Sequence, residues 1–125
     1  MRLSLSALIA AAGLSLGLPA TALSAELIMV AQRACGYCAN FDRELGSQYD
    51  STVAGQIAPL RRVSPLKPWP VDLAAVTPVH MTPVFIVVDG GKEVGRFPGY
   101  DGEEGFWQRL NPILAKLPNG HVATK

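Results

Sequence analysis

Residues 26–41 read ELIMVAQRACGYCANF, and this stretch decides the fold. Its first part, from Leu27 to Ala31, is apolar without interruption, which is typical of a strand that is buried on both faces. After the motif Cys35-Gly36-Tyr37-Cys38, apolar side chains recur at helical spacing as far as about Tyr49. A buried strand, a C-x-x-C pair and then an amphipathic helix together predict a dithiol redox site.

Cys35 and Cys38 are the only cysteines of the chain. One such pair can form neither a scaffold of several disulfides nor a zinc site of four thiolates. A disulfide across two residues closes a very short loop and restricts the unfolded chain little, so it contributes little stability. The pattern therefore favours a reversible redox pair over an inert bridge or a metal site.

The position of the motif predicts different roles for its two thiols. We expect Cys35 at or just before the start of the helix and Cys38 in its first turn, where unpaired backbone N–H groups carry partial positive charge. These groups stabilise a thiolate and lower the pKa of Cys35 below the free value of about 8.5. Cys35 is then the exposed nucleophile, and Cys38 resolves the mixed disulfide. Arg33 either lowers that pKa further or is an ordinary solvated loop charge.

The N-terminal 25 residues have the pattern of a secretory signal peptide. Arg2 is the only charge before Glu26, an apolar run follows it, and small residues lead up to Ala25. The alternative is an uncleaved membrane anchor, since about 20 apolar residues span a bilayer. We predict a signal peptide at 1–25, a domain at 26–118 and a tail at 119–125, with a periplasmic location.

The charge balance excludes one class of partner. The whole chain carries 11 basic and 10 acidic residues, so loss of Arg2 with the signal leaves a neutral domain. A neutral domain of this size has no broad positive field, and we exclude nucleic acid as a partner. The length suffices for one small domain.

The rest of the chain predicts an α/β domain with a mixed central sheet of about four strands and helices on both faces. We expect the order β-α-β-(short α)-β-β-α. Asp101 is expected to cap the last helix, with Glu104 completing a capping box. The other expected elements are strands at 57–63, 84–88 and 92–97, a short helix at 71–76, and a helix stop at 118–120.

Three features together resemble the thioredoxin superfamily: the C-G-Y-C motif after a strand, Thr82-Pro83 before the next main strand, and Gly99 after the hairpin. The resemblance implies that Pro83 is cis and faces the dithiol, and that the Thr82 backbone binds an extended segment of the partner. It also implies that Gly36, Tyr37 and Gly99 contribute to substrate binding. Without it, Pro83 reads as a trans proline at a strand edge and Gly99 as an ordinary turn glycine.

The chain departs from thioredoxins proper. They have Trp before the first cysteine, Gly-Pro between the two, and a buried acid beneath the dithiol; here Ala34 and Gly36-Tyr37 stand instead, and no acid lies between Leu27 and Cys35. The Gly-Tyr pair is similar to exported disulfide isomerases of the C type, which carry an additional dimerisation domain. Within the superfamily, the chain resembles the small exported thioredoxins of sulfur-oxidation clusters, the SoxS type, which have a single domain and a C-G-Y-C site.

The sequence thus predicts a monomeric exported thiol–disulfide oxidoreductase that reduces a protein disulfide or a cysteine adduct. It requires no metal or organic cofactor, and its implied reductant is a membrane thiol-electron transporter. Alternatives are a disulfide isomerase or oxidase, a binding module with a fixed disulfide, and a copper(I) chaperone in which His80 or Met81 assists the cysteines.

Several other residues allow two interpretations. Arg61, Arg62 and Lys67 form either a basic patch for an acidic partner or glutathione, or a solvated face. Trp69 either flanks the binding groove or anchors its loop. We expect Trp107 in the core of the last helix and His121 in solvent.

Overall fold

A computed structural model describes residues 13, 17 and 25–120 of the chain. The predicted signal peptide lies largely outside the described residues, and so do His121 and the rest of 121–125. The order of elements from β1 to α3 is the predicted one, with one additional helix.

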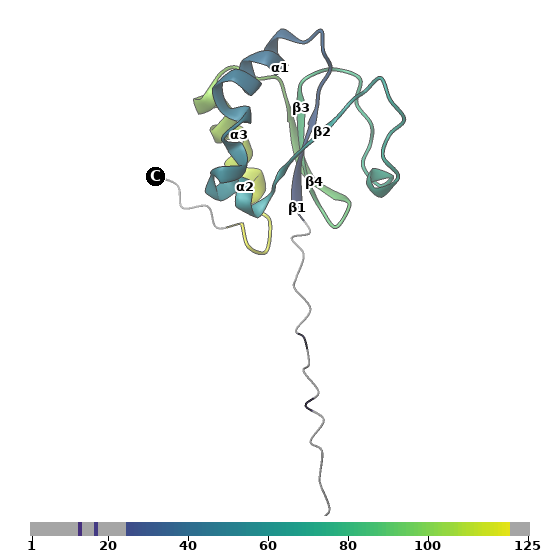
Figure 1. Ribbon diagram of the computed structural model, residues 1–125, viewed down its shortest axis with the longest axis vertical. Coiled ribbons are helices and arrows are strands. Elements are labelled where there is room, and N and C mark those ends of the chain that lie inside the picture. Colours follow the sequence, from purple (N-terminus) through teal and green to yellow (C-terminus); the bar gives the residue numbers. More distant parts are fainter. Residues whose placement is uncertain (1–12, 14–16, 18–24, 121–125) are drawn as a thin grey trace, which may run out of the picture.

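The centre of the domain is a four-stranded mixed sheet, in the order β2-β1-β3-β4. β1 pairs with β2 in parallel and with β3 antiparallel, and β3 pairs antiparallel with β4. For the described residues, the predicted α/β class and the predicted mixed sheet of about four strands are therefore confirmed (Figure 1). The strands are β1 (Ala25–Val30), β2 (Leu60–Val63), β3 (Val84–Asp89) and β4 (Lys92–Pro98).

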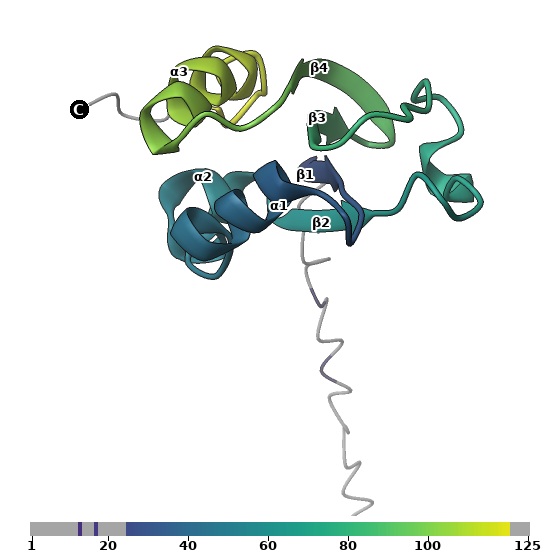
Figure 2. The same ribbon diagram turned by 90° about the horizontal axis from the view of Figure 1, so that it is seen from above.

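The three α-helices cover one face of this sheet. Figure 2 shows α1 (Gly36–Phe41), α2 (Val53–Ile57) and α3 (Glu103–Leu114) on the same side of the strands. Between α1 and α2 the chain forms a π-helical turn, η1 (Asp42–Gly46), and a 3-10 turn, η2 (Tyr49–Ser51). Side chains from β1 and β3 pack here against the helices in the larger core cluster.

Phe106 of α3 lies at the middle of this core and is fully buried. Its ring centroid is 5.3 Å from that of Phe41 in α1 and 5.1 Å from that of Phe85 in β3. Trp107 is half-buried against the same cluster and stacks on Tyr49, which agrees with its predicted place in the core. The aromatic cluster thus joins α1, which begins at the dithiol, to the sheet and to α3.

The opposite face of the sheet is covered by the segment 64–83, which contains the 3-10 turn η3 (Val71–Leu73) (Figure 2). Leu73 and Val76 pack there on Ile28, Ile86 and neighbouring strand residues. The predicted short helix is thus a single turn, and helical cover of this face is slight.

Other predicted details are wrong. The second strand was expected to begin at Ile57, but Ile57 ends the short helix α2 and β2 begins only at Leu60. Thr52 caps α2, its Oγ1 accepting a hydrogen bond from the N–H of Gly55 at 3.0 Å. The last helix ends at Leu114, before the predicted stop at 118–120. Asp101 and Glu104 form no capping box, because Gly102 is the N-cap of α3 and makes no side-chain cap. Asp101 instead pairs with Arg109.

Candidate active site

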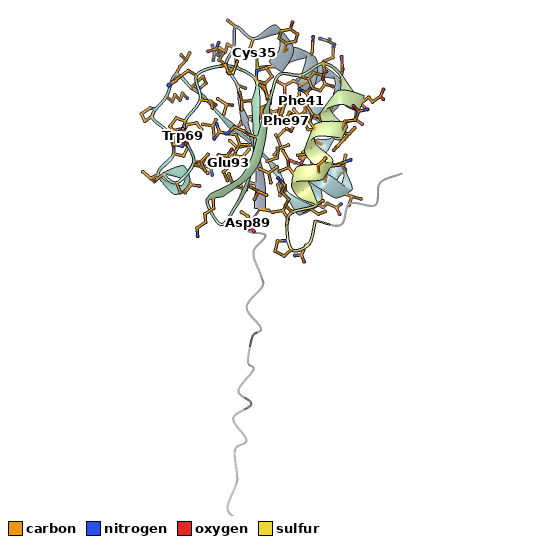
Figure 3. The ribbon with its side chains drawn as sticks, turned by 180° about the vertical axis from the view of Figure 1, so that it is seen from behind. Cys35, Phe41, Trp69, Asp89, Glu93 and Phe97 are labelled. Carbon is orange, nitrogen blue, oxygen red and sulfur yellow. A yellow bond between two sulfur atoms is a disulfide. The ribbon has the colours of Figure 1, made fainter. Side chains whose placement is uncertain are left out.

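The register of the sheet brings three predicted site segments to one end of the domain. Val30, the last residue of β1, pairs with Val84 at the start of β3, which pairs with Pro98 at the end of β4. Each residue of this row adjoins one site segment: the loop to Cys35 follows Val30, the Thr82-Pro83 step precedes Val84, and Gly99 follows Pro98. In Figure 3, Cys35 accordingly lies at the opposite end of the molecule from Asp89, which begins the hairpin turn.

Cys35 and Cys38 form a disulfide, with their Cα atoms 5.2 Å apart. Cys35 is the N-cap of α1, and its Sγ accepts a hydrogen bond from the backbone N–H of Cys38 at 3.1 Å. The Cys35 sulfur therefore occupies the acceptor position that a Ser, Thr or Asp oxygen takes at most helix starts. This confirms the predicted placement of the two cysteines on α1.

The two cysteines differ slightly in exposure. Cys35 is 9 % exposed and Cys38 4 % in the disulfide form. Both side chains are therefore buried, and the predicted exposure of Cys35 is wrong for the disulfide form, in which its sulfur is bonded to Cys38. The next residue along the motif, Gly36, is exposed, and the Tyr37 side chain is 63 % exposed beside the disulfide. The Gly36-Tyr37 turn beside the disulfide is thus open to solvent.

The peptide bond between Thr82 and Pro83 is cis, as the resemblance implied. Pro83 is buried, Thr82 is half-buried and Met81 before them is 62 % exposed. Gly99 donates its N–H to the Pro83 carbonyl at 2.8 Å, so the turn after β4 is held against the cis-proline segment. Gly99 has a φ of 77°, which favours glycine, and a Cβ at this position would meet nothing within 4 Å. The backbone therefore favours glycine here, as at an ordinary turn, and open space adjoins the position.

A family model described as a thioredoxin-like domain matches residues 24–113. The chain belongs to the thioredoxin-like family.

Among solved structures, the chain is similar to the periplasmic thioredoxin SoxS of Paracoccus pantotrophus, determined in its reduced form. The two are 39 % identical with a TM-score of 0.67, and the match covers 71 % of this chain and 94 % of that one. No curated protein matches this chain. With the C-x-x-C disulfide on the first turn of α1, these findings identify a thiol–disulfide oxidoreductase that acts on protein thiols or disulfides.

One departure from thioredoxins proper is visible in the structure as well. No Asp, Glu or other charged side chain is buried among the described residues, so none of them supplies an acid beneath the dithiol. Glu26 lies near the start of β1, the end of that strand away from the motif, where it pairs with Arg61 at 3.4 Å. Proton transfer at Cys38 must therefore use solvent or a group other than a buried carboxylate.

A groove that the sequence did not predict lies beside Cys38. It has a volume of about 890 Å³ and is lined by the β1–α1 loop, by Cys38 and by residues of β2 and the segment after it. Three cations line it: Arg33, Arg62 and Lys67. Arg62 pairs there with Asp42 at 2.5 Å. These residues are dispersed in sequence and meet because β2 lies beside β1.

Arg61 does not belong with Arg62 and Lys67, because adjacent strand residues point to opposite faces. Its guanidinium binds Asp72 of η3 at 2.6 Å and lies 3.4 Å from Glu26. The hydrogen bond from Arg61 is the main cause that holds the pKa of Asp72 below its usual value. The predicted basic patch is therefore divided, and Arg61 anchors the segment 64–83 to the sheet.

Trp69 also anchors this segment, since its indole N–H donates to the Leu73 carbonyl at 3.0 Å. It lies on the side of the domain away from α3 (Figure 3). His80 is exposed, like Met81. No group of three or more His, Cys, Asp or Glu side chains suited to a metal occurs among the described residues.

Proposed function

We propose that this protein is an exported reductase of protein disulfides or cysteine adducts, with Cys35 as nucleophile and Cys38 as resolving thiol. The observation that carries the proposal is the hydrogen bond from the Cys38 N–H to the Cys35 sulfur at the start of α1. The same N–H, together with the positive end of the helix, stabilises a Cys35 thiolate once the disulfide is reduced.

In the proposed reaction, the Cys35 thiolate attacks one sulfur of the substrate disulfide. A Cys35–substrate disulfide forms, and the other substrate sulfur leaves as a thiolate and takes a proton. The Cys38 thiolate then attacks the Cys35 sulfur, which forms the Cys35–Cys38 disulfide seen here and releases the second substrate thiol. Two electrons pass from the cysteine pair to the substrate.

The substrate segment is proposed to lie along the end of the sheet where Thr82, Pro83 and Gly99 meet the motif. The open space at Gly99 and the exposed turn of Gly36 and Tyr37 support this placement. Thr82 precedes the row in which Val84 pairs with Val30 and Pro98, so we propose that an extended segment meets its backbone at this end of the central strand β3.

We place the protein in the periplasm, with residues 1–25 as its signal peptide, 26–118 as its domain and 119–125 as its tail. The support is the charge and hydropathy pattern of the N-terminus and the similarity to a periplasmic thioredoxin. None of the described helices is long and apolar enough to cross a membrane. Because the periplasm is kept oxidising, a reductase there needs electrons from a membrane thiol transporter. The SoxS-type resemblance supports a role in sulfur oxidation.

Trapping the substrate tests this function directly. A Cys38→Ser variant lacks the resolving thiol, so Cys35 should remain joined to its target in a periplasmic extract. Mass spectrometry then identifies the partner, and the band should disappear on reduction. The matched control, Cys35→Ser, should trap nothing. Equal trapping by both variants, or none by Cys38→Ser while Cys35 still reacts with iodoacetamide, would contradict the proposal.

A further inference from the structure

The groove beside Cys38 has a more positive charge than the protein as a whole. Arg33, Arg62 and Lys67 against Asp42 give it a formal charge of +2, whereas the entire chain carries +1. Arg62 is partly neutralised by its ion pair with Asp42. Arg33 and Lys67 are exposed and have no ion pair with any of the described residues. The groove therefore contains two cations whose charge is available to a ligand.

The groove also offers apolar contact. Leu66 lines it and is 79 % exposed, one of the most exposed large apolar side chains of the described residues. Val63 and Ala34 contribute further apolar surface, so both cations and apolar groups line a cavity of about 890 Å³. A single small anion would contact only part of such a groove. A polypeptide segment with carboxylates and an apolar residue matches both the volume of the groove and the chemistry of its lining.

We propose that this groove binds an acidic segment of the substrate protein, close in sequence to the cysteine that Cys35 attacks. The inference rests on the proposed reductase function and adds a substrate class to it. Because Cys38 itself lines the groove, a segment bound there lies next to the dithiol throughout the exchange. Arg33 and Lys67 supply the attraction, and Leu66 supplies the apolar contact.

The test uses two synthetic peptides with an internal disulfide, identical except that two Glu residues beside the cysteines are Gln in the second. For the wild-type protein at low salt, we expect kcat/KM to be about fivefold higher for the Glu peptide, through KM. The ratio should fall to less than about twofold in 0.5 M NaCl, because salt screens exposed charges.

In the variant Arg33→Gln/Lys67→Gln, the ratio of kcat/KM for the Glu peptide to that for the Gln peptide should be about one. Lys92→Gln/Lys116→Gln is the matched control, because it removes the same charge from two exposed lysines outside the groove. It should keep the ratio of the wild type. A ratio of one in the wild type, an unchanged ratio in the groove variant, or an equal loss in the control would overturn the inference.

Oxidised glutathione and its methyl ester separate a peptide from a small anionic disulfide. The preference for the free acid over the methyl ester is compared with the preference for the Glu peptide over the Gln peptide. If the two preferences are equal and both need Arg33 and Lys67, the groove recognises a small carboxylate. The assignment to a polypeptide is then wrong. Reduction of the Gln peptide distinguishes failure of the proposed reductase function from failure of the groove assignment. If the wild type reduces no disulfide at all, the proposed function fails; if it reduces both peptides equally, only the groove assignment fails.

Discussion

Phe106 shows how one residue supports the site from a distance. Its ring contacts aromatic residues of α1, of β3 and of β4, including Phe97, whose ring centroid lies 5.7 Å away. Phe41, three residues after Cys38, packs directly on it. The position of the first turn of α1 therefore depends on this side chain.

We predict that Phe106→Ala lowers the free energy of unfolding by about 3–5 kcal/mol, because it removes a fully buried ring and leaves a cavity. Urea denaturation of the oxidised protein measures this loss. Phe106→Leu, which fills most of the space, should cost less than about 1.5 kcal/mol. A loss below about 1 kcal/mol for the alanine variant would show that this ring is not central to the core.

Tyr49 predicts a particular pH dependence. Its hydroxyl is buried and donates to the Ala58 carbonyl at 3.0 Å; burial, and to a lesser extent the charge of Asp50, raise its pKa well above the usual value. A group whose pKa is raised by folding contributes stability below its unfolded pKa of about 10, and that stability is lost as the pH rises from there through the folded pKa.

We therefore expect the free energy of unfolding to fall by about 1 kcal/mol more in the wild type than in Tyr49→Phe between pH 9 and pH 11. Denaturant titrations at the two pH values provide the comparison. The variant also loses the hydrogen bond to Ala58, so only its slope with pH is informative. Parallel slopes for the two proteins would contradict the assignment of Tyr49 as a buried neutral phenol.

The helices, compared one by one, differ in how their starts are stabilised. α1 begins at a sulfur acceptor, α2 at the Thr52 hydroxyl, and α3 at Gly102 without a side-chain cap. Glu104 of α3 accepts a hydrogen bond from Gln108 on the helix surface, not from the N-cap backbone. The last helix is held instead by Arg109, which pairs with Asp101 and donates to the Pro98 carbonyl at 2.8 Å.

This difference predicts that Thr52→Ala lowers the free energy of unfolding by about 0.5–2 kcal/mol, the usual cost of a lost N-cap. Glu104→Gln should change it by less than about 0.5 kcal/mol, because Glu104 caps nothing. Thermal or urea unfolding of both variants gives the answer. A loss at Glu104 as large as that at Thr52 would support the capping box that the sequence suggested.

The strands were predictable because their signals are local: β1 and β3 are uninterrupted apolar runs, and Asp89-Gly90-Gly91 is a strong turn signal. Helix α2 was not predictable from the sequence, because it is only one turn long and contains Gly55. Glycine is required there, since a Cβ added at this position would lie 2.0 Å from the Tyr49 carbonyl oxygen. Burial of Cys38, Phe41, Leu45 and Tyr49 was predicted correctly, although a π-helical turn interrupts the α-helix between them.

The same distinction applies to the site. The dithiol and the cis-proline step were predictable from motifs a few residues long. The groove could not be predicted from the sequence, because Arg33 and Lys67 are brought together only by the parallel pairing of β1 with β2. For the same reason, the sequence could not show that Arg61 and Arg62 belong to opposite faces and have separate partners.

For the whole molecule, the redox poise of the cysteine pair decides the direction of the reaction. Gly36 and Tyr37 stand between the cysteines and bring no positive charge that would stabilise the reduced thiolate form. We predict a reduction potential near the thioredoxin value of about −270 mV, measured by equilibration with thiol redox buffers. A value near about −120 mV would indicate an oxidase instead.

All of this depends on Cys35 being a reactive thiolate in the reduced protein. The most direct measurement is the rate of iodoacetamide alkylation of Cys35 against pH, with Cys38→Ser as the single-thiol protein. The account predicts that Cys35 titrates with a pKa clearly below the free value of about 8.5 and is alkylated rapidly at pH 7. A pKa at or above that value, or a Cys35 that reacts no faster than Cys38 in the matching Cys35→Ser protein, would contradict it.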